Sequence, residues 1–303
     1  MNELDTIERI KRKIPVSPGS GIIVGVGDDC AVLRLPGAEE DLLLTTDMLL
    51  EDVHFQRRTH PADAAGHKAL ARPLSDIASM GGAPRFCLVS LALAPWTDSR
   101  WLDGFYRGLL RLGRQTGTRL AGGDLARGRR LACDVAVLGV VPRGKALRRD
   151  RARPGDSLYV SGRLGGAALG LKSGRGEAFK LHLRPSPRLE LGRFLRERLS
   201  ATAAIDLSDG LSLDLHRLCR ASGVAASIEL ALPLFRGADL DQALHGGEDY
   251  ELLFTAPPGV RPPSEHNGIP LTRIGTIRKG KPGAVDFLGR PLAPLGYDHF
   301  LNR

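Results

Sequence analysis

LLLTTDMLL, residues 42–50, is an apolar run typical of a buried β-strand, and the remaining elements can be ordered around it. Three polar residues, Thr45, Thr46 and Asp47, interrupt the run. Polar side chains in a buried strand need partners, because an unpaired polar group costs free energy when it leaves water. These three residues therefore need an explanation beyond packing.

Strands and helices alternate on both sides of this run. Apolar spacing predicts helices over 3–14, 62–80, 101–117 and 187–200, and apolar runs predict strands over 86–94, 131–141, 157–162, 225–230 and 251–256. Pro73 is expected to kink or break the second helix. The alternation indicates an α/β or α+β protein with two layers per domain.

The length of the chain indicates two domains. Its 303 residues exceed one ordinary α/β core and suit two of about 150 residues each. The segment 142–156, PRGKALRRDRARPGD, interrupts the alternation with two prolines and two glycines. We therefore predict one domain over 1–142 and a second over 143–303.

The composition, 42% hydrophobic and 25% charged, is that of a soluble globular protein. No run of 18 apolar residues predicts a membrane span, and the N-terminal segment lacks the apolar region of a signal peptide. The chain has four cysteines, Cys30, Cys87, Cys133 and Cys219. Because no two of them form a CxxC pair, they argue against a zinc site or a disulfide scaffold. We expect a cytoplasmic protein with no membrane partner.

The net charge of +9 has two interpretations. It could attract nucleotides or nucleic acid, or it could reflect arginines spread over solvated faces. Only residues 143–153 are dense in charge, with six basic residues against one acidic, and aromatic residues make up 5% of the chain. Stacking platforms for single-stranded nucleic acid are therefore scarce, and we expect no nucleic-acid partner.

Phosphate-transfer signatures of the common kinds are absent, since the chain has no GxxxxGK[ST] loop and no HRD or DFG motif. Acidic residues instead recur beside Gly, Ser or Thr. They occur in GVGDD (Asp28, Asp29), TTD (Asp47), LSD (Asp76), GGD (Asp124), DLSDG (Asp206, Asp209) and GGED (Glu248, Asp249). Small neighbours leave room for a hard cation and for phosphate oxygens, and magnesium prefers such oxygen ligands.

Each motif also has a purely structural interpretation. An Asp before Gly commonly forms a turn, Ser208 with Asp209 could cap a helix, and the glycine-rich stretch 163–171 could simply start one. Six such motifs in one chain, several inside apolar strands, favour a site that binds metal and phosphate.

The motifs resemble those of the thiamine-monophosphate kinase family. VGVGDDCAVL, TTDMLLEDVHF, HKALARPLSDIASMGG, AGGDLARG, GDSLYVSG, HLRPSPR, AIDLSDGLSLDL, GGEDYELLFT and GYDHF occur in that family's order, from about residue 20 to the C-terminus. The resemblance implies the two-domain fold of the aminoimidazole ribonucleotide synthetase superfamily. It further implies that the N-terminal domain binds ATP and metal and that its sheet pairs with its twin in a homodimer.

The implied reaction is transfer of the γ-phosphoryl group of ATP to thiamine phosphate, which gives ADP and thiamine diphosphate. ATP and thiamine phosphate are then the expected partners, with several Mg²⁺ ions as cofactors. The acceptor oxygen is already ionised, so catalysis would depend on positioning and charge neutralisation rather than on a general base.

The resemblance also implies roles for individual residues. The metal ligands would be Asp29, Thr45, Thr46, Asp47, Asp76, Asp124, Asp206 and Asp209, with Asp47, Asp124 and Asp209 as the catalytic set. Tyr106, Gly123, Asp124, Arg149 and Ser208 would bind the nucleotide, and His54, Glu248 and Tyr297 would bind thiamine phosphate.

Two positions depart from the family pattern. Pro73 stands where the family usually has Asn before Leu, which affects the expected helix geometry around Asp76. Asp52 stands where the family commonly has Gly or Asn, at the expected entry to the thiamine site.

Other enzymes of the superfamily are alternatives. A selenide, water dikinase should carry a reactive Cys or selenocysteine near its N-terminus, and the first cysteine here is Cys30, followed by Ala. A hydrogenase-maturation dehydratase should end in a cysteine-bearing tail, whereas this chain ends HFLNR. An aminoimidazole ribonucleotide synthetase-like enzyme remains an alternative because it would share the fold. A basic nucleic-acid binder remains as an alternative of a different class.

Overall fold

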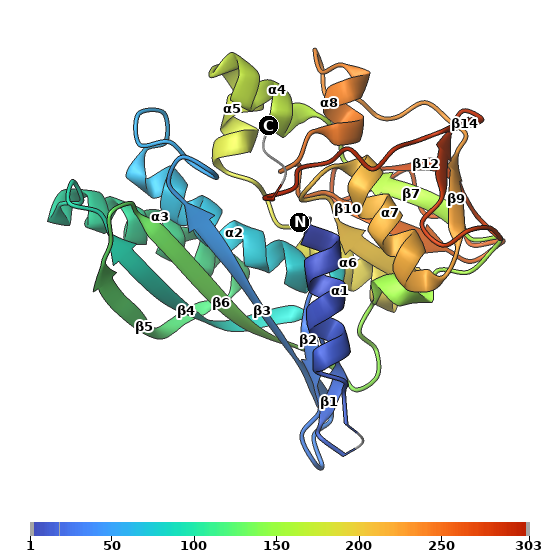
Figure 1. Ribbon diagram of the computed structural model, residues 1–303, viewed down its shortest axis with the longest axis horizontal. Coiled ribbons are helices and arrows are strands. Elements are labelled where there is room, and N and C mark those ends of the chain that lie inside the picture. The colour runs from blue at the N-terminus through green and yellow to red at the C-terminus, as the bar shows by residue number, and fades with distance from the viewer. Residues whose placement is uncertain (1–2, 18, 301–303) are drawn as a thin grey trace.

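The computed structural model describes residues 3–17 and 19–300, and its strands form two sheets (Figure 1). The first has the order β1-β2-β3-β6-β4-β5, with only β4 and β5 parallel. Its strands are β1 (Ile22–Val24), β2 (Ala31–Leu33), β3 (Glu40–Leu50), β4 (Ala83–Leu93), β5 (Arg119–Arg127) and β6 (Ala132–Pro142).

The second sheet has the order β14-β13-β9-β12-β7-β10-β8, with β11 added beside β12. Its strands are β7 (Ser157–Ser161), β8 (Ala203–Asp206), β9 (Ala225–Ile228), β10 (Leu252–Ala256), β11 (Glu265–His266), β12 (Ile269–Arg278), β13 (Val285–Phe287) and β14 (Arg290–Pro291). The helices are α1 (Glu3–Lys13), α2 (Ala62–Ser79), α3 (Ser99–Thr116), α4 (Gly166–Ser173), α5 (Gly176–Leu183), α6 (Leu189–Glu197), α7 (Leu211–Ser222) and α8 (Leu240–His245), with a 3₁₀ turn at Arg149–Arg151. The predicted mixed α/β class is confirmed.

The two sheets divide the chain between Pro142, the end of β6, and Ser157, the start of β7. One apolar core draws on residues 30–146, and two others draw on residues 147–285. The domain boundary between residues 142 and 143 stays a prediction. Among the described residues, no helix combines the length and the apolar character needed to cross a membrane.

Helix α2 continues through Pro73, so the predicted break is wrong. Proline removes one helical hydrogen bond and costs about 3 kcal/mol in a helix interior. Most of α2 is buried against α3, α6 and the first sheet, and this burial outweighs the local cost. Asp76 therefore stays on a regular helix and keeps a fixed direction.

The GGD motif is also not a turn, because residues 122–124 lie inside β5. Gly123 pairs with Val89 of β4, and a Cβ atom there would lie 1.8 Å from the Val89 carbonyl oxygen. Gly123 is thus explained by close strand approach. Its strand, missed in the sequence, forms one edge of the first sheet.

One face of the first sheet, which we call the open face, carries no described helix over β4 and β5, whereas α1 lies beside it at β2 and β3. Helices α2 and α3 pack on the opposite face (Figure 1). Strand register places Met48, Asp134, Ser90 and Asp124 in one row across the open face. The exposed fractions of Met48, Phe86 and Leu88 are 50%, 46% and 49%. Such an apolar surface on a sheet is typical of an interaction site.

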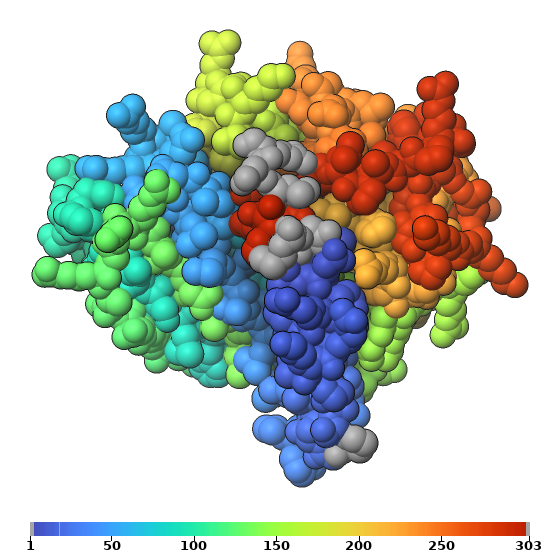
Figure 2. Space-filling view, in the orientation of Figure 1, coloured from blue at the N-terminus to red at the C-terminus, as the bar shows by residue number. Residues whose placement is uncertain are grey.

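Helix α1 lies over the boundary between the two halves, as Figure 2 shows in dark blue. Its acidic first turn and basic last turn complement the helix dipole. None of its residues is buried, yet Leu4 and Ile7 line the cleft described below. The helix therefore forms one wall of that cleft.

A reciprocal glycine contact joins α2 to α3. A Cβ at Gly66 would lie 1.9 Å from the Phe105 carbonyl oxygen, and one at Gly108 would lie 1.8 Å from the Asp63 carbonyl oxygen. The two backbones thus approach as closely as glycine allows.

Gly108→Ala should lower stability by about 2–3 kcal/mol, because backbone atoms must move to admit the methyl group. Helix propensity alone predicts the opposite sign, since alanine is favoured over glycine by about 1 kcal/mol in a helix. Denaturant unfolding measures the sign. Gly122→Ala, whose Cβ would meet only the Leu88 side chain at 3.5 Å, is the control and should change little. A more stable Gly108→Ala variant would contradict the close contact.

Candidate active site

A cleft of about 1530 Å³ lies between the two halves of the chain. Residues of α1, the first sheet, α2, the β8–α7 loop and the C-terminal segment all line it. The predicted site residues that line it are Asp29, Thr45, Thr46, Asp47, His54, Asp76, Arg149, Asp206, Ser208, Asp209, Glu248 and Tyr297. Residues that are separated by up to about 270 positions in the sequence therefore meet in one cleft.

Three carboxylates form an acidic centre in this cleft. Oxygen atoms of Asp29, Asp76 and Asp206 all lie within 4.8 Å of one another. Burial, followed by the charge of Asp206, raises the pKa of Asp76 well above its usual value. Burial and the charge of Asp29 do the same to the pKa of Asp206. Like charges this close are unfavourable unless a proton or a cation joins them.

The oxygen atoms around the acidic centre are suitable ligands for a hard cation. Oδ2 of Asp206 is buried and has no hydrogen-bond partner among the described residues. The Thr45 hydroxyl donates to Asp76, and the Ser79 hydroxyl donates to Asp29 at 2.7 Å. An all-oxygen set with an orphaned carboxylate oxygen is the environment that Mg²⁺ prefers.

Strand β3 presents its polar residues to both faces of the sheet. Thr45 and Asp47 face α2, since Arg72 of that helix donates to Asp47 at 2.8 Å. Thr46 points to the open face and donates to Asp134 of β6 at 2.6 Å. The period-2 alternation of a strand thus sends neighbouring predicted ligands to opposite sides.

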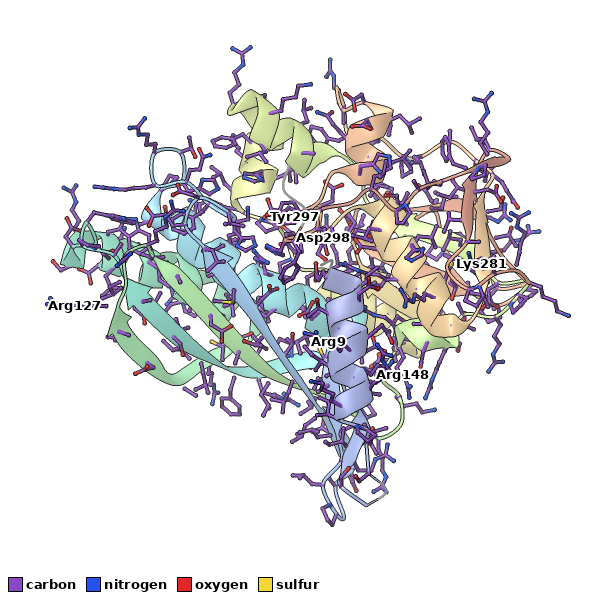
Figure 3. All side chains as sticks on the ribbon, viewed as in Figure 1. Arg9, Arg127, Arg148, Lys281, Tyr297 and Asp298 are labelled. Atoms are coloured by element: carbon purple, nitrogen blue, oxygen red, sulfur yellow. The ribbon has the colours of Figure 1, made fainter. Side chains whose placement is uncertain are left out.

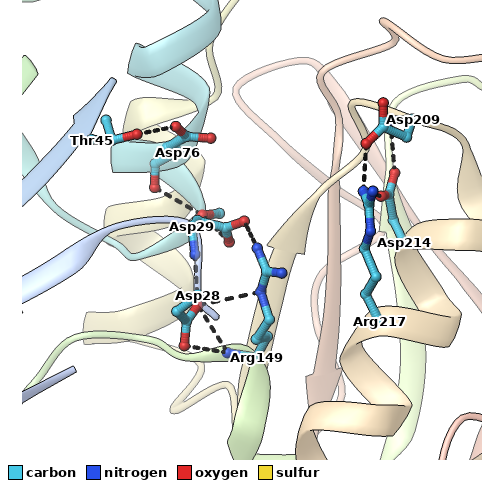
Figure 4. A network of polar contacts seen from close by, with 9 residues as sticks. Asp28, Asp29, Thr45, Asp76, Arg149, Asp209, Asp214 and Arg217 are labelled. Atoms are coloured by element: carbon cyan, nitrogen blue, oxygen red, sulfur yellow. Dashed lines mark hydrogen bonds and ion pairs between the residues drawn. The ribbon is translucent and has the colours of Figure 1, made fainter. Parts of the chain in front are cut away.

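Arg149 lines the cleft and lies beside Asp28 and Asp29 (Figure 4). Its guanidinium pairs with Asp29, and its backbone N–H lies 3.3 Å from an Asp28 carboxylate oxygen. Burial raises the pKa of Asp28 to about 7, although Arg149 opposes the shift. The arginine therefore stabilises Asp29, a member of the acidic centre, and the adjacent Asp28.

Arg217 has the same role on the other side of the view in Figure 4, where it pairs with Asp209 and Asp214. The Asp214 carboxylate also accepts from the backbone N–H groups of Asp209 and Gly210 at 3.0 Å. Gly210, not Ser208 or Asp209, is the N-cap of α7. The capping interpretation of Ser208 and Asp209 is therefore wrong, because the loop turns one residue later.

Glu248 is held by basic residues from both halves of the chain. Lys68 of α2, whose side chain is fully buried, donates to Glu248 at 2.9 Å and to the His54 carbonyl oxygen at 3.0 Å. His182 Nδ1 lies 2.9 Å from the same carboxylate. Burial would raise the pKa of Glu248, but Lys68 and His182 lower it well below its usual range. Glu248 is therefore a fixed negative charge.

His54 and Tyr297 line the same cleft as Glu248. We call the part of the cleft that holds Glu248 the carboxylate end. Burial and Arg72 lower the pKa of His54 to about 3, so its imidazole is neutral at physiological pH. The rings of His54 and Tyr297 each contact the ring of His299, with centroids 5.2 Å and 4.8 Å apart. Tyr297 and Asp298 lie beside the N-terminal end of α1 (Figure 3), where the backbone N–H of Glu3 donates to Asp298.

The structure does not bring Tyr106, Gly123 and Asp124 into this cleft. Tyr106 is on α3 and packs against the core beneath the first sheet. Strands β6 and β4 separate β5 from β3, so Asp124 lies three strand spacings, roughly 14 Å, from Thr46. Asp124 and Thr46 share the open face but do not meet within one chain.

The residues missed in the sequence are mainly basic. Lys68, Arg72, His182 and Arg217 all line the site or bond to it, yet none was predicted. Lys68 and Arg72 are four residues apart and so share one face of α2 with Asp76. That spacing beside an acidic motif was the available signal.

Comparisons with known proteins agree with this geometry. Residues 27–141 match the family model described as AIR synthase related protein, N-terminal domain. A relative named thiamine-monophosphate kinase, from Escherichia coli (strain K12), is 40% identical over 311 residues, covering 91% of this chain and 92% of the relative.

Two solved structures are similar over nearly their whole length. One, described as AaThiL complexed with AMPPCP and TMP, has a TM-score of 0.86 and 32% identity, and the match covers 99% of this chain and 97% of that chain. Thiamine-monophosphate kinase from Stenotrophomonas maltophilia K279a has a TM-score of 0.77 and 38% identity, with 96% of each chain covered. With identity of this extent over the chain that builds the cleft, the protein belongs to the thiamine-monophosphate kinase family.

Proposed function

We propose that this protein transfers the γ-phosphoryl group of ATP to thiamine phosphate and releases ADP and thiamine diphosphate. The observation that carries the proposal is the acidic centre, which lines one cleft together with Arg149, Ser208, His54 and Glu248. A relative of high structural similarity is described as complexed with AMPPCP and TMP, an ATP analogue and a thiamine phosphate.

The chemistry needs little from the protein beyond position and charge. An oxygen of the acceptor phosphate forms a bond to the γ-phosphorus while the bond from that phosphorus to the β-phosphate oxygen breaks, and ADP leaves. No proton is removed from the acceptor, because its phosphate is already ionised. A fixed anion at Glu248 suits the cationic thiazolium ring, and the Tyr297 face adds cation–π attraction.

Asp29, Asp76 and Asp206 would hold Mg²⁺, with Thr45, Asp47 and Asp209 on its borders. Bound there, the cation would neutralise the phosphate oxygens and make the approach of two polyanions feasible. The orientation of the Asp76 and Asp206 carboxylates is fixed, because these residues lie on the regular elements α2 and β8.

We infer that the active protein is a homodimer joined through the open face. Met48, Phe86 and Leu88 expose apolar side chains on that face, and β5 leaves a nine-residue edge unpaired among the described strands. Two such faces packed about a two-fold axis would bring Asp124 of the partner subunit towards Thr46 and Asp134. Gly123 and Asp124 would then complete the site in trans.

A cytoplasmic location fits the proposal. The four cysteines are free and buried, as expected for a chain kept in a reducing compartment. In the basic segment 143–153, Arg148 pairs with Asp150, and Arg149 pairs with Asp29. These pairs reduce the charge available to nucleic acid.

With ATP and Mg²⁺, the purified protein should convert thiamine phosphate to thiamine diphosphate, and free thiamine should be a poor acceptor. The neutral hydroxyl of thiamine lacks the negative oxygen for which the site is arranged. Chromatographic separation of the products measures both rates. Equal or faster turnover of free thiamine would contradict the proposal.

Asp206→Asn should stabilise the metal-free protein. The pKa of Asp206 is raised on folding, so its ionised form opposes folding above that pKa, and the penalty disappears as pH falls and the group is protonated. In EDTA at pH 8 the variant should melt about 3 °C or more above wild type, and the difference should shrink at acid pH. Mg²⁺ should raise the melting temperature of wild type but not of the variant.

Asp41→Asn is the matched control for that experiment. A hydrogen bond from Arg34 lowers the pKa of Asp41, so this carboxylate stabilises the fold at neutral pH. Its variant should melt below wild type and keep the Mg²⁺ response. If Asp206→Asn melts lower than wild type in EDTA, the repulsion argument is wrong.

Co-expression of Asp47→Asn and Asp124→Asn chains tests the shared site. If Asp124 acts in trans, each heterodimer has one site with both aspartates, and random pairing restores about one quarter of wild-type activity. Asp47→Asn with Asp206→Asn is the control, since both residues act in the chain that carries them and no site is restored. Equal, negligible activity in both mixtures would place Asp124 in its own chain's site, whereas about half of wild-type activity in the first mixture would place it outside the chemistry.

A further inference from the structure

Arg72 is a buried cation that the roles described so far do not use. Its side chain is 11% exposed and lines the cleft from α2. Nη2 donates to Asp47 at 2.8 Å, but Nε and Nη1 are buried without a hydrogen-bond partner among the described residues. Buried donors are nearly always satisfied, so two orphaned nitrogens on one guanidinium need an explanation.

Arg72 lies between the acidic centre and the carboxylate end of the cleft, since it follows Lys68 and precedes Asp76 on α2. Burial would lower its pKa, but Tyr250, Asp47 and Glu248 raise it, so the guanidinium stays charged. It also acts on His54, whose pKa it lowers. Arg72 is therefore close to both the Asp47 side and the Glu248 side of the cleft.

Three other buried or half-buried cations at the cleft already pair with carboxylates. Arg149 pairs with Asp28 and Asp29, and Arg217 pairs with Asp209 and Asp214. Lys68, one helical turn before Arg72, pairs with Glu248. Arg72 alone among these four combines an ion pair with two buried, unpartnered nitrogens.

We propose that Arg72 binds the phosphate group of the acceptor, thiamine phosphate, through its free Nε and Nη1 nitrogens. This rests on the proposed function, which places the thiazolium ring near Glu248 and the acceptor phosphate towards the acidic centre. A molecule in that orientation passes its phosphate beside Arg72. Guanidinium groups bind phosphate through parallel N–H donors, and a charge-assisted pair in a buried site is strong.

The proposal makes Arg72 a specificity-determining residue as well as a catalytic one. Free thiamine has no phosphate and would leave the two nitrogens unsatisfied, whereas thiamine phosphate would satisfy both. A site with buried polar groups rejects a ligand that leaves them unpaired. Discrimination between the two ligands should therefore depend on this one side chain.

Isothermal titration with thiamine phosphate and with thiamine, in Mg²⁺ and without ATP, measures that discrimination. Arg72→Met should weaken thiamine phosphate binding on the order of 10–100-fold, the range for charged hydrogen bonds, and change thiamine binding less than about twofold. Arg72→Lys should recover part of the loss, because it keeps the charge but not the fork. Steady-state kinetics should show a raised KM for thiamine phosphate and an unchanged KM for ATP.

Arg34→Met is the matched control, because Arg34 forms a bidentate pair with the buried Asp41 away from the cleft. It should lower the melting temperature and leave both affinities unchanged. If Arg72→Met does not fold, Arg72→Gln, which retains donors without charge, replaces it and should show the same selective loss.

The outcomes separate this inference from the proposed function. Wild type that turns over thiamine phosphate, with an Arg72→Met variant that binds both ligands as wild type does or loses both equally, overturns the role of Arg72 alone. Wild type that neither binds nor phosphorylates thiamine phosphate overturns the proposed function itself. Selective loss of thiamine phosphate binding in the variant supports the inference.

Discussion

Repulsion among three buried carboxylates is the constraint on which the arrangement of the cleft depends. Asp29, Asp76 and Asp206 lie within 4.8 Å of one another, where screening by water is weak. Arg149 pairs with Asp29, whereas Oδ2 of Asp206 has no hydrogen-bond partner among the described residues. The fold thereby retains an excess of negative charge at one point, which a divalent cation can neutralise. We expect the same repulsion to lower the stability of the metal-free chain.

Helix α2 connects this centre to the rest of the site. Lys68, Arg72 and Asp76 recur at four-residue steps and face Glu248, Asp47 and Thr45 in turn. One regular helix thus sets the distance between the end that holds Glu248 and the end that holds the acidic centre. Its other side contacts α3 through the glycine contact at Gly66 and Gly108, which leaves it little freedom to shift. The cost of Pro73 is tolerated because this packing determines the course of the helix.

The open face shows how the same sheet serves two purposes. Strand alternation directs Thr45 and Asp47 towards α2, and it directs Thr46 towards Asp134 on the uncovered side. The apolar side chains beside Thr46 favour a second subunit, whose edge strand would carry an additional aspartate. A site divided in this way would link phosphoryl transfer to assembly, since an isolated chain would lack part of its acidic set.

Local sequence was sufficient to predict many of the strands and helices and the acidic residues of the cleft. Apolar runs and helical spacing predicted β3, β4, β6, α2 and α3, and the acidic motifs predicted the members of the acidic centre. These succeed because periodicity and turn chemistry are properties of neighbouring residues. The edge position of β5, and so the separation of Asp124 from Thr46, depends on strand order across the whole sheet. Lys68 and Arg72 read as ordinary solvated charges on a helix, and only tertiary packing buries them against Glu248 and Asp47. Burial is decided by contacts among segments far apart in sequence, and burial is what turns these two cations into parts of the site.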